Sequence, residues 1–284
     1  MLKTLSVPER ILRPRTGWFR LDLARLLQHR DLLYLLVRRD LVSRYQQTIL
    51  GPLWFLLQPL LLTGVFTLVF NRGLGTSTDG VPAHLFYLSG MLLWAYFANV
   101  LTGAGNTFQV NAPVFTKVYF PRLVVPLAVV LASIVPLLLQ MLLFLGFYVP
   151  ALLGARTWQP IPVALALLPL TLGQVALLAL GVSLLASGLS AKYRDLQHAL
   201  PFVVQMWMFA TPVIYPLSQL GPLARWVAAL NPLACPVEML RLACFGTGTL
   251  TPQLATLSLG STLLVLAAGL FVFQRAERTF ADTV

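Results

Sequence analysis

Long segments without a charged side chain alternate along this chain with short clusters of Lys and Arg. Six segments contain no Asp, Glu, Lys or Arg, and they are residues 45–71, 80–116, 123–155, 157–191, 196–224 and 242–274. Each is longer than the roughly 20 residues that a helix needs to cross about 30 Å of hydrocarbon. Their apolar positions are continuous rather than alternating, which argues against the half-polar strands of a membrane β-barrel. The pattern predicts an all-α integral membrane protein with six transmembrane helices.

The six spans are expected at about residues 50–70, 85–107, 123–150, 163–190, 200–215 and 254–273. Between the last two spans, residues 216–252 are too apolar for a solvated loop and are interrupted by prolines and glycines. This composition favours two short re-entrant helices between spans five and six, provided that protein covers their backbone ends.

An amphipathic segment precedes the first span. Residues 18–30, WFRLDLARLLQHR, place polar and apolar side chains on opposite faces of a helix, which is typical of an N-terminal helix in the membrane interface. The apolar run 32–37 is too short to span and is expected to continue along the same surface. Residues 1–284 are predicted to form a single transmembrane domain, made of an interfacial segment (1–44), the six-span region (45–274) and a tail (275–284).

Composition agrees with this class, and the distribution of charge predicts an orientation. Hydrophobic residues make up 58% of the 284 residues, charged residues make up 10%, and the mean hydropathy is +0.80. With six spans, 16 of the 20 Lys and Arg residues fall on the side of the two termini. The positive-inside rule therefore predicts that both termini are cytoplasmic. Only four basic residues fall on the other side, and they are Arg72, Arg156, Arg225 and Arg241.

The net charge of +11 has the same explanation. Basic residues that flank membrane spans set topology and attract anionic lipid headgroups, so we do not expect a nucleic-acid partner. The predicted headgroup contacts are Arg25, Arg38, Arg39 and Arg44.

Residues that the spans lack exclude several functions. Transport driven by a proton or sodium gradient usually needs an ionisable side chain or an unwound ion site in the membrane, and the six segments carry no Asp, Glu, Lys or Arg. None of Lys3, Lys117 and Lys192 follows a glycine, so a phosphate-binding loop for ATP is missing. No catalytic, metal or cofactor site is expected in this chain. If the chain works as a pump, a partner must supply the energy.

Uncharged amides and aromatic rings recur in or near the spans and allow two interpretations. Amides in membrane helices typically form interhelical hydrogen bonds, and rings near span ends typically form an interfacial belt. Rings that stack on sugars and amides that exchange hydrogen bonds with hydroxyls would also suit a path for a sugar polymer. The candidates for lining such a path are Trp54, Phe55, Tyr96, Trp207 and Tyr215.

A family resemblance favours the second interpretation. Residues 38–70, RRDLVSRYQQTILGPLWFLLQPLLLTGVFTLVF, resemble the opening of ABC-2 family permeases that export cell-surface polysaccharides. The resemblance continues in order through LSGMLLWAYFAN, VFTKVYFPRLVVPLA, SAKYRDLQHALPFVVQMWMFATPVIYP and LNPLACPVEMLR, and it is strongest with exporters of O-antigen and related polysaccharides. It implies a homodimer that joins two copies of a separate cytoplasmic ATPase subunit, which binds ATP and Mg.

The resemblance also implies roles for individual segments. Lipid-linked polysaccharide would pass between the two permeases from the cytoplasm to the periplasm, across the inner membrane of a bacterium. Residues 216–252 would form an outer gate, and a short cytoplasmic helix between spans two and three would sit in a cleft of the ATPase. The residues assigned to this coupling contact are Phe115, Thr116, Lys117 and Tyr119, with Arg122 as a topological anchor.

Several alternatives share parts of this pattern. On the same fold, the chain could export teichoic acid, a capsule polymer, or a small hydrophobic drug or lipid. From other classes, it could be a membrane scaffold without transport, or an enzyme of polyprenyl phosphates for which AKYRDLQH, residues 191–198, is the nearest approach to a site.

Overall fold

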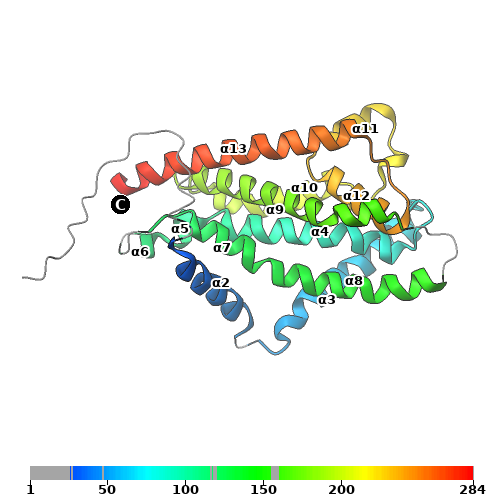
Figure 1. Ribbon diagram of the computed structural model, residues 1–284, viewed down its shortest axis with the longest axis horizontal. Coiled ribbons are helices and arrows are strands. Elements are labelled where there is room, and N and C mark those ends of the chain that lie inside the picture. Colours follow the sequence, from blue (N-terminus) through cyan, green and yellow to red (C-terminus); the bar gives the residue numbers. More distant parts are fainter. Residues whose placement is uncertain are drawn as a thin grey trace, which may run out of the picture.

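The protein is an all-α integral membrane protein (Figure 1). The computed structural model describes residues 26, 28–46, 48–115, 117, 120–154 and 160–283, and every regular element in these ranges is a helix. Five helical segments are long and apolar enough to cross a membrane, namely Gly51–Gly73, Ala83–Ala104, Val124–Gly154, Pro162–Ser190 and Pro252–Arg278. These correspond to predicted spans one, two, three, four and six.

Prolines determine where several of these helices begin or break. The first span joins η1 (Gly51–Leu53), α3 (Trp54–Phe66) and η2 (Thr67–Gly73), and Pro52 lies in its first turn. The third span is α7 (Val124–Ala132) followed by α8 (Ile134–Gly154). Pro136 has no N–H to donate to the carbonyl of Ala132, which accounts for the interruption between these two helices.

The fifth predicted span differs from the structure in length and position. Instead of residues 200–215, the helix α10 is Leu196–Ala210. Its 15 residues reach about 22 Å, which is less than the hydrocarbon thickness of about 30 Å. The chain then continues without regular structure to η3 (Leu217–Gln219).

Two short helices are confirmed in the next segment, as predicted for a re-entrant pair. They are α11 (Pro222–Ala229) and α12 (Ala234–Phe245), and their axes differ by 104°. Gly246 ends α12 in the left-handed conformation, with φ of 70°, and its N–H bonds the carbonyl of Leu242. We call residues 211–250 the outer hairpin.

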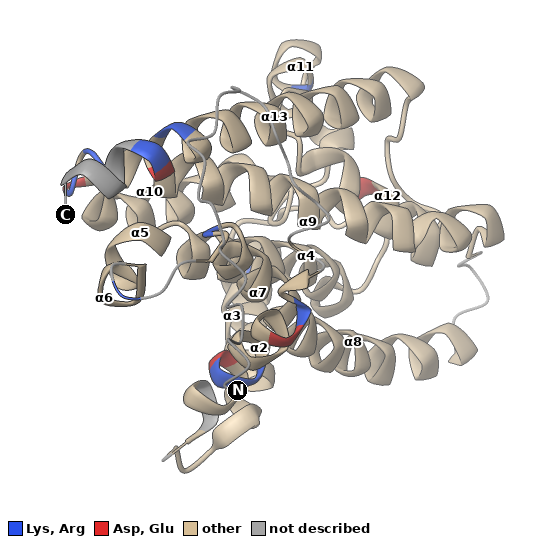
Figure 2. Cartoon of the chain, turned by 60° about the vertical axis from the view of Figure 1, so that its left-hand side comes forward, with Lys and Arg blue, Asp and Glu red and all other residues tan. Residues whose placement is uncertain are grey.

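The two ends of the helix bundle differ in charge (Figures 1 and 2). One end, here called the basic end, holds α5 (Thr107–Val110), α6 (Ala112–Phe115), the turn between α9 (Pro162–Ser190) and α10, and the last turns of α13 (Pro252–Thr283). The outer hairpin lies at the opposite end. Because α13 runs to Thr283, the tail predicted from residue 275 is a continuation of the last helix.

The N-terminal part begins with α2 (Arg30–Tyr45), which packs against α7. The interfacial helix predicted for residues 18–30 falls almost entirely outside the described residues.

The helix α4 (Ala83–Ala104) forms the centre of the bundle. It packs against α3, α8 and α9, and most of its residues are buried, whereas only Pro59, Thr63 and Phe66 of α3 are buried. The large rings of Phe86, Tyr87 and Phe97 are fully buried on it. The exposed and apolar surface of α3 therefore faces lipid or another protein.

Glycines bring α9 and α13 into backbone contact. A Cβ added to Gly181 would lie 2.8 Å from the backbone of Leu266, and one added to Gly188 would lie 2.8 Å from the side chain of Val272. From the other side, Gly269 faces the backbone of Gly181. Small residues of this kind are how membrane helices pack without a hydrophobic driving force between them.

This contact predicts a position-specific effect on stability. Gly181→Ala should destabilise the chain by about 1–3 kcal/mol, because the methyl group cannot fit without separating the two helices. The measurement is the thermal unfolding midpoint of the purified chain in detergent. Gly173→Ala is the matched control, since Gly173 lies on the same helix with no atom within 4 Å of an added Cβ. Equal midpoints for the two variants would contradict the close contact.

Candidate functional site

Two exposed helices carry an uncharged amide between apolar neighbours. On α3, Gln58 follows Trp54 by one turn, and both side chains are exposed. On α10, Gln205 is exposed together with Phe202 and Phe209, which lie one turn away on either side. Residues three or four apart share one face of a helix, so each amide lies within a stripe of rings.

The central helix contributes a third amide. The ring of Phe66 on α3 packs edge-on against Tyr87 near the beginning of α4, with ring centroids 5.9 Å apart. Further along α4, Asn99 is half-buried and Thr102 is exposed. These residues lie on three helices, and α3 and α10 each pack against α4. We group Trp54, Gln58, Asn99, Thr102 and Gln205 under the name amide face.

The amide face is chemically unusual for a surface in lipid. Within the described part of the chain, the carboxamides of Gln58, Asn99 and Gln205 make no hydrogen bond. A carboxamide that faces hydrocarbon without a partner costs free energy, so such groups mark a surface that meets water, protein or a polar ligand. Each amide can donate and accept hydrogen bonds at once, which matches the chemistry of hydroxyl groups.

The five residues predicted to line a path for sugar differ in their exposure. Trp54 is 52% exposed, whereas Tyr96 is 3% exposed and its hydroxyl donates to the carbonyl of Val130 at 3.4 Å. Tyr96 therefore belongs to the core. Phe55, Trp207 and Tyr215 are half-buried.

Asn231 ties the outer hairpin to α10. Its Oδ1 accepts from the Trp207 indole at 3.2 Å and from the N–H of Leu233 at 3.1 Å. Its Nδ2 donates to the carbonyl of Ala210 at 3.1 Å and to the hydroxyl of Thr211 at 2.9 Å. One side chain thus satisfies polar groups at the end of α10 and at the beginning of the turn into α12.

Arg241 and Glu238 form a buried ion pair inside the outer hairpin. The Nη1 of Arg241 lies 3.2 Å from the Oε1 of Glu238, and the two side chains are each 2% exposed. The guanidinium carbon also lies 3.6 Å from the ring centroid of Phe86 on α4, and Nη2 donates to the carbonyl of Val213 at 3.0 Å. The carboxylate accepts from the N–H of Thr249 at 2.8 Å. The pair therefore joins α12, α4, the turn after α10 and the loop after α12.

A third set of polar contacts covers the tip of the hairpin. Arg225 on α11 donates to the carbonyls of Leu217, Ser218 and Leu220 at 3.0–3.4 Å. The hydroxyl of Ser218 lies 2.8 Å from the carboxylate oxygens of Asp79, which belongs to the loop before α4. These bonds supply partners for backbone groups that no regular helix would satisfy.

At the basic end, an aromatic cluster joins the segment 105–122 to α13. The ring of Phe108 lies 4.7 Å from that of Phe273 and 6.0 Å from that of Phe115, between centroids. Arg122 lies over Phe115 at 5.4 Å, and its Nη1 donates to the carbonyl of Glu277 at 2.8 Å. Arg122 is thus a packing residue in addition to its predicted topological role.

The predicted coupling residues fall into different environments. Phe115 is 7% exposed, so its ring is not available to a partner protein. Lys117 is exposed, and so are Pro113 and Val114 on the preceding turn. Thr116 and Tyr119 lie outside the described residues.

Of the predicted headgroup contacts, Arg38 and Arg39 are exposed on α2. Arg39 also lies 3.6 Å from a carboxylate oxygen of Asp40. Arg25 and the side chain of Arg44 lie outside the described residues.

Sequence reasoning missed Asn231 and Glu238 and treated Arg241 only as a topological charge. The signal was present, because a Glu and an Arg three residues apart in VEMLR share one face of a helix that is otherwise apolar. Among the described residues, no group of three or more His, Cys, Asp or Glu could hold a metal ion.

The chain is similar to one protein family and to several transport proteins of bacteria. A family model described as ABC-2 type transporter matches residues 31–245. The O-antigen export system permease protein RfbA of Myxococcus xanthus is 30% identical over 264 residues, which cover 91% of this chain and 97% of the relative. The protein of the same name from Klebsiella pneumoniae is 27% identical over 89% of this chain and 94% of the relative. The polysialic acid transport protein KpsM of Escherichia coli is 26% identical over 84% and 91%.

The buried pair predicts strong coupling between two substitutions. Arg241→Met should destabilise the chain by about 3–5 kcal/mol, because it leaves the carboxylate of Glu238 buried without a counter-charge. Glu238→Gln combined with Arg241→Met should cost less than the sum of the two single changes, since no lone charge is then buried. Thermal unfolding of the purified variants measures this, with Arg72→Met as a control at an exposed site. Additive effects would mean that the pair is not a unit.

Proposed function

This chain belongs to the ABC-2 type transporter family, and on that premise we propose that it is the transmembrane permease subunit of an ATP-driven exporter of lipid-linked, O-antigen-like polysaccharide. The observation that carries the proposal is the amide face. Amides set between rings on exposed membrane helices suit a polymer that presents hydroxyl groups and apolar sugar faces in alternation. A path for a small hydrophobic drug or lipid would have no need of unpartnered amides.

The amide face supports assembly as a homodimer. On a single chain it would lie against lipid, where its unpartnered carboxamides are costly. Two copies that turn their amide faces toward each other would remove this cost and enclose a polar passage between apolar outer surfaces. The exposed apolar side chains of α3, such as Leu61 and Val65, would then pack in the contact between the copies.

Charge distribution supports the orientation. Lys117, Arg122, Lys192 and Arg194 belong to the basic end, which we place in the cytoplasm of a bacterium by the positive-inside rule. The protein would then lie in the inner membrane with both termini cytoplasmic. The outer hairpin would close the periplasmic end of the passage, and the polymer would leave through it.

Energy would come from two copies of a cytoplasmic ATPase, which bind ATP and Mg. We assign the contact to the exposed side chains of Val114 and Lys117. Behind them, Phe115 packs on Phe120 at 5.7 Å and on Phe108. A push on this surface would reach α13 through the Phe108 and Phe273 contact as a rigid-body displacement.

Reconstitution tests the function directly. Vesicles would hold the chain with its ATPase, and lipid-linked polysaccharide would be supplied in the outer leaflet. We expect the polymer to become protected from an added glycan-cleaving enzyme only when both proteins and ATP are present. Protection without ATP, or the same protection from vesicles that lack this chain, would refute the proposal. Product formation by the purified chain alone would indicate a polyprenyl-phosphate enzyme, and intact polymer export in cells without the chain would indicate a scaffold.

The amide face predicts a selective loss of transport. Gln58→Leu and Gln205→Leu should each lower the export rate by about two- to tenfold, because each removes a hydrogen-bonding group of about 0.5–1.5 kcal/mol from the passage. The thermal unfolding midpoint should not fall, since both side chains are exposed. The matched control is Gln253→Leu, an exposed amide at the beginning of α13. A control variant that loses as much export as the other two would contradict the assignment.

The proposed ATPase contact at Val114 and Lys117 predicts that substitutions there impair binding of the ATPase without lowering the stability of this chain. Val114→Asp with Lys117→Glu should abolish co-purification with the ATPase and leave thermal unfolding nearly unchanged, because both side chains are exposed. Phe115→Ala should instead destabilise the chain by about 3–5 kcal/mol, since it empties a buried site. Arg72→Glu, at the far end, is the control for charge reversal. Retention of the ATPase by the double variant would refute this contact.

A further inference from the structure

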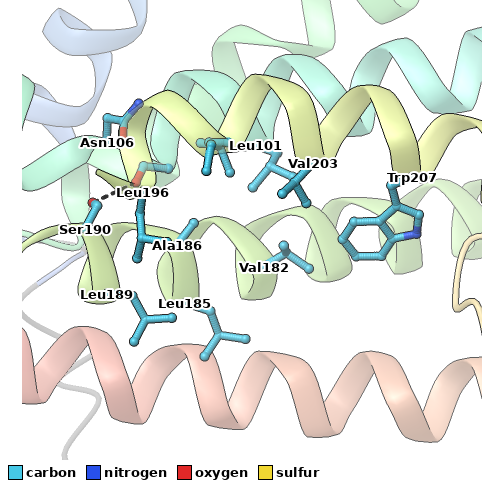
Figure 3. Close-up of a pocket in the computed structure, with 13 residues that line it drawn as sticks. Leu101, Asn106, Val182, Leu185, Ala186, Leu189, Ser190, Leu196, Val203 and Trp207 are labelled. Atoms are coloured by element: carbon cyan, nitrogen blue, oxygen red, sulfur yellow. Dashed lines mark hydrogen bonds between the residues drawn. The ribbon is translucent and has the colours of Figure 1, made fainter. Parts of the chain in front are cut away.

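A narrow groove lies between α4, α9 and α10 near the basic end of the bundle (Figure 3). Its volume is about 210 Å³, and its walls are almost entirely apolar, with Leu101, Val182, Leu185 and Val203 among the lining residues. Trp207 closes one end. Asn106 and Ser190 lie at the other, where the hydroxyl of Ser190 already bonds the carbonyls of Gly105 and Ser187. The groove therefore suits an apolar ligand, because it presents almost no polar groups along its length.

The helix α10, which borders this groove, buries few of its residues against the rest of the protein. Val204 is the only buried residue within α10, and Leu196, Ala199 and Val203 along the groove are exposed. The distance along α10 from Leu196 to Trp207 is about 16 Å, or about half of the hydrocarbon thickness. The groove thus has the length of an acyl chain in a single leaflet, on the side of the basic end.

Two cations lie in the turn between α9 and α10, which follows the lining residue Ser190 in the sequence. Lys192 and Arg194 are exposed in the turn between α9 and α10, between the lining residues Leu189 and Leu196. The Nζ of Lys192 lies 5.1 Å from the ring centroid of Tyr193, which leaves the ammonium group at the surface. Asp195 in the same turn is the only opposing charge between residues 191 and 196. The turn therefore carries a net charge suited to a phosphate.

We propose that this groove binds an anionic glycerophospholipid of the leaflet at the basic end, with one acyl chain in the groove and its phosphate at Lys192 and Arg194. The acyl chain of the lipid fills the space between α9 and α10 and completes the packing of α10. The lipid acts on the side of α10 opposite to Gln205, because Gln205 is about half a helical turn away from Val203 and Trp207. The bound lipid stabilises the position of α10 and is distinct from any ligand of the amide face.

Photo-crosslinking tests the assignment. The probe is phosphatidylglycerol with a diazirine in one acyl chain, in vesicles that contain the full-length chain. We expect labelled peptides from residues 182–207, and we expect unlabelled phosphatidylglycerol to compete better than phosphatidylcholine. The variant Lys192→Gln with Arg194→Gln should lower the apparent affinity on the order of tenfold. Lys192→Arg with Arg194→Lys keeps both charges and should keep the labelling.

A second variant tests the groove itself. Ala186→Phe should fill it and remove the labelling, whereas Leu170→Phe, at an exposed site on the same helix, should not. The proposal is overturned if phosphatidylcholine competes equally well, if the charge-removing variant labels as strongly as the charge-keeping one, or if no label reaches residues 182–207. It is also overturned if a polyprenyl phosphate displaces the probe at lower concentration than phosphatidylglycerol, because the groove would then belong to a lipid carrier. These variants leave the amide face intact, so failure here is distinguishable from failure of the export assay.

Discussion

The contact between Arg241 and Glu238 is the constraint on which the hairpin end of this structure depends. Two charges inside an apolar protein are tolerated only when each finds a partner, and here the partners come from four separate segments. Neither α12 nor the turn after α10 can move alone without separating a buried charge from one of its partners. Asn231 adds a neutral link of the same kind. The outer hairpin is therefore connected to α4 and α10, the helices that carry Asn99 and Gln205.

Contacts at the opposite end connect a surface segment to α13 and α9. Phe108 and Arg122 contact α13 at Phe273 and Glu277, and α13 lies in backbone contact with α9 through glycines. Gln109 donates to the carbonyl of Ser190 at 2.8 Å, which adds a direct link to the end of α9. Because packed helices move as rigid bodies, a displacement of this segment would shift α9 and α13 together. Such a shift would alter the groove beside α10 and the amide face beyond it.

Most of the architecture could be predicted from the sequence, because lipid imposes a simple rule on apolar length. Five spans and the re-entrant pair follow from runs of uncharged residues interrupted by proline and glycine. The end of α10 has a local signal that apolar length alone misses, because Pro212 disfavours the helical conformation at Thr211, which is extended. Asn231 and Arg241 then supply hydrogen-bond partners to the carbonyls of Ala210 and Val213. The burial of Tyr96 and Phe115 also depends on tertiary packing, which the sequence pattern does not reveal. Trp54 and Lys117 are exposed, as their predicted roles require.

We propose that polysaccharide passes along the amide face. The most direct measurement places a photo-crosslinking amino acid at position 58 or 205 in cells that are exporting polymer, with position 170, an exposed site on α9, as the reference. We expect glycan-carrying adducts at positions 58 and 205 that depend on ATP hydrolysis by the partner, and we expect none at position 170. Glycan adducts of equal yield at all three positions, or none at 58 and 205 during active export, would contradict it.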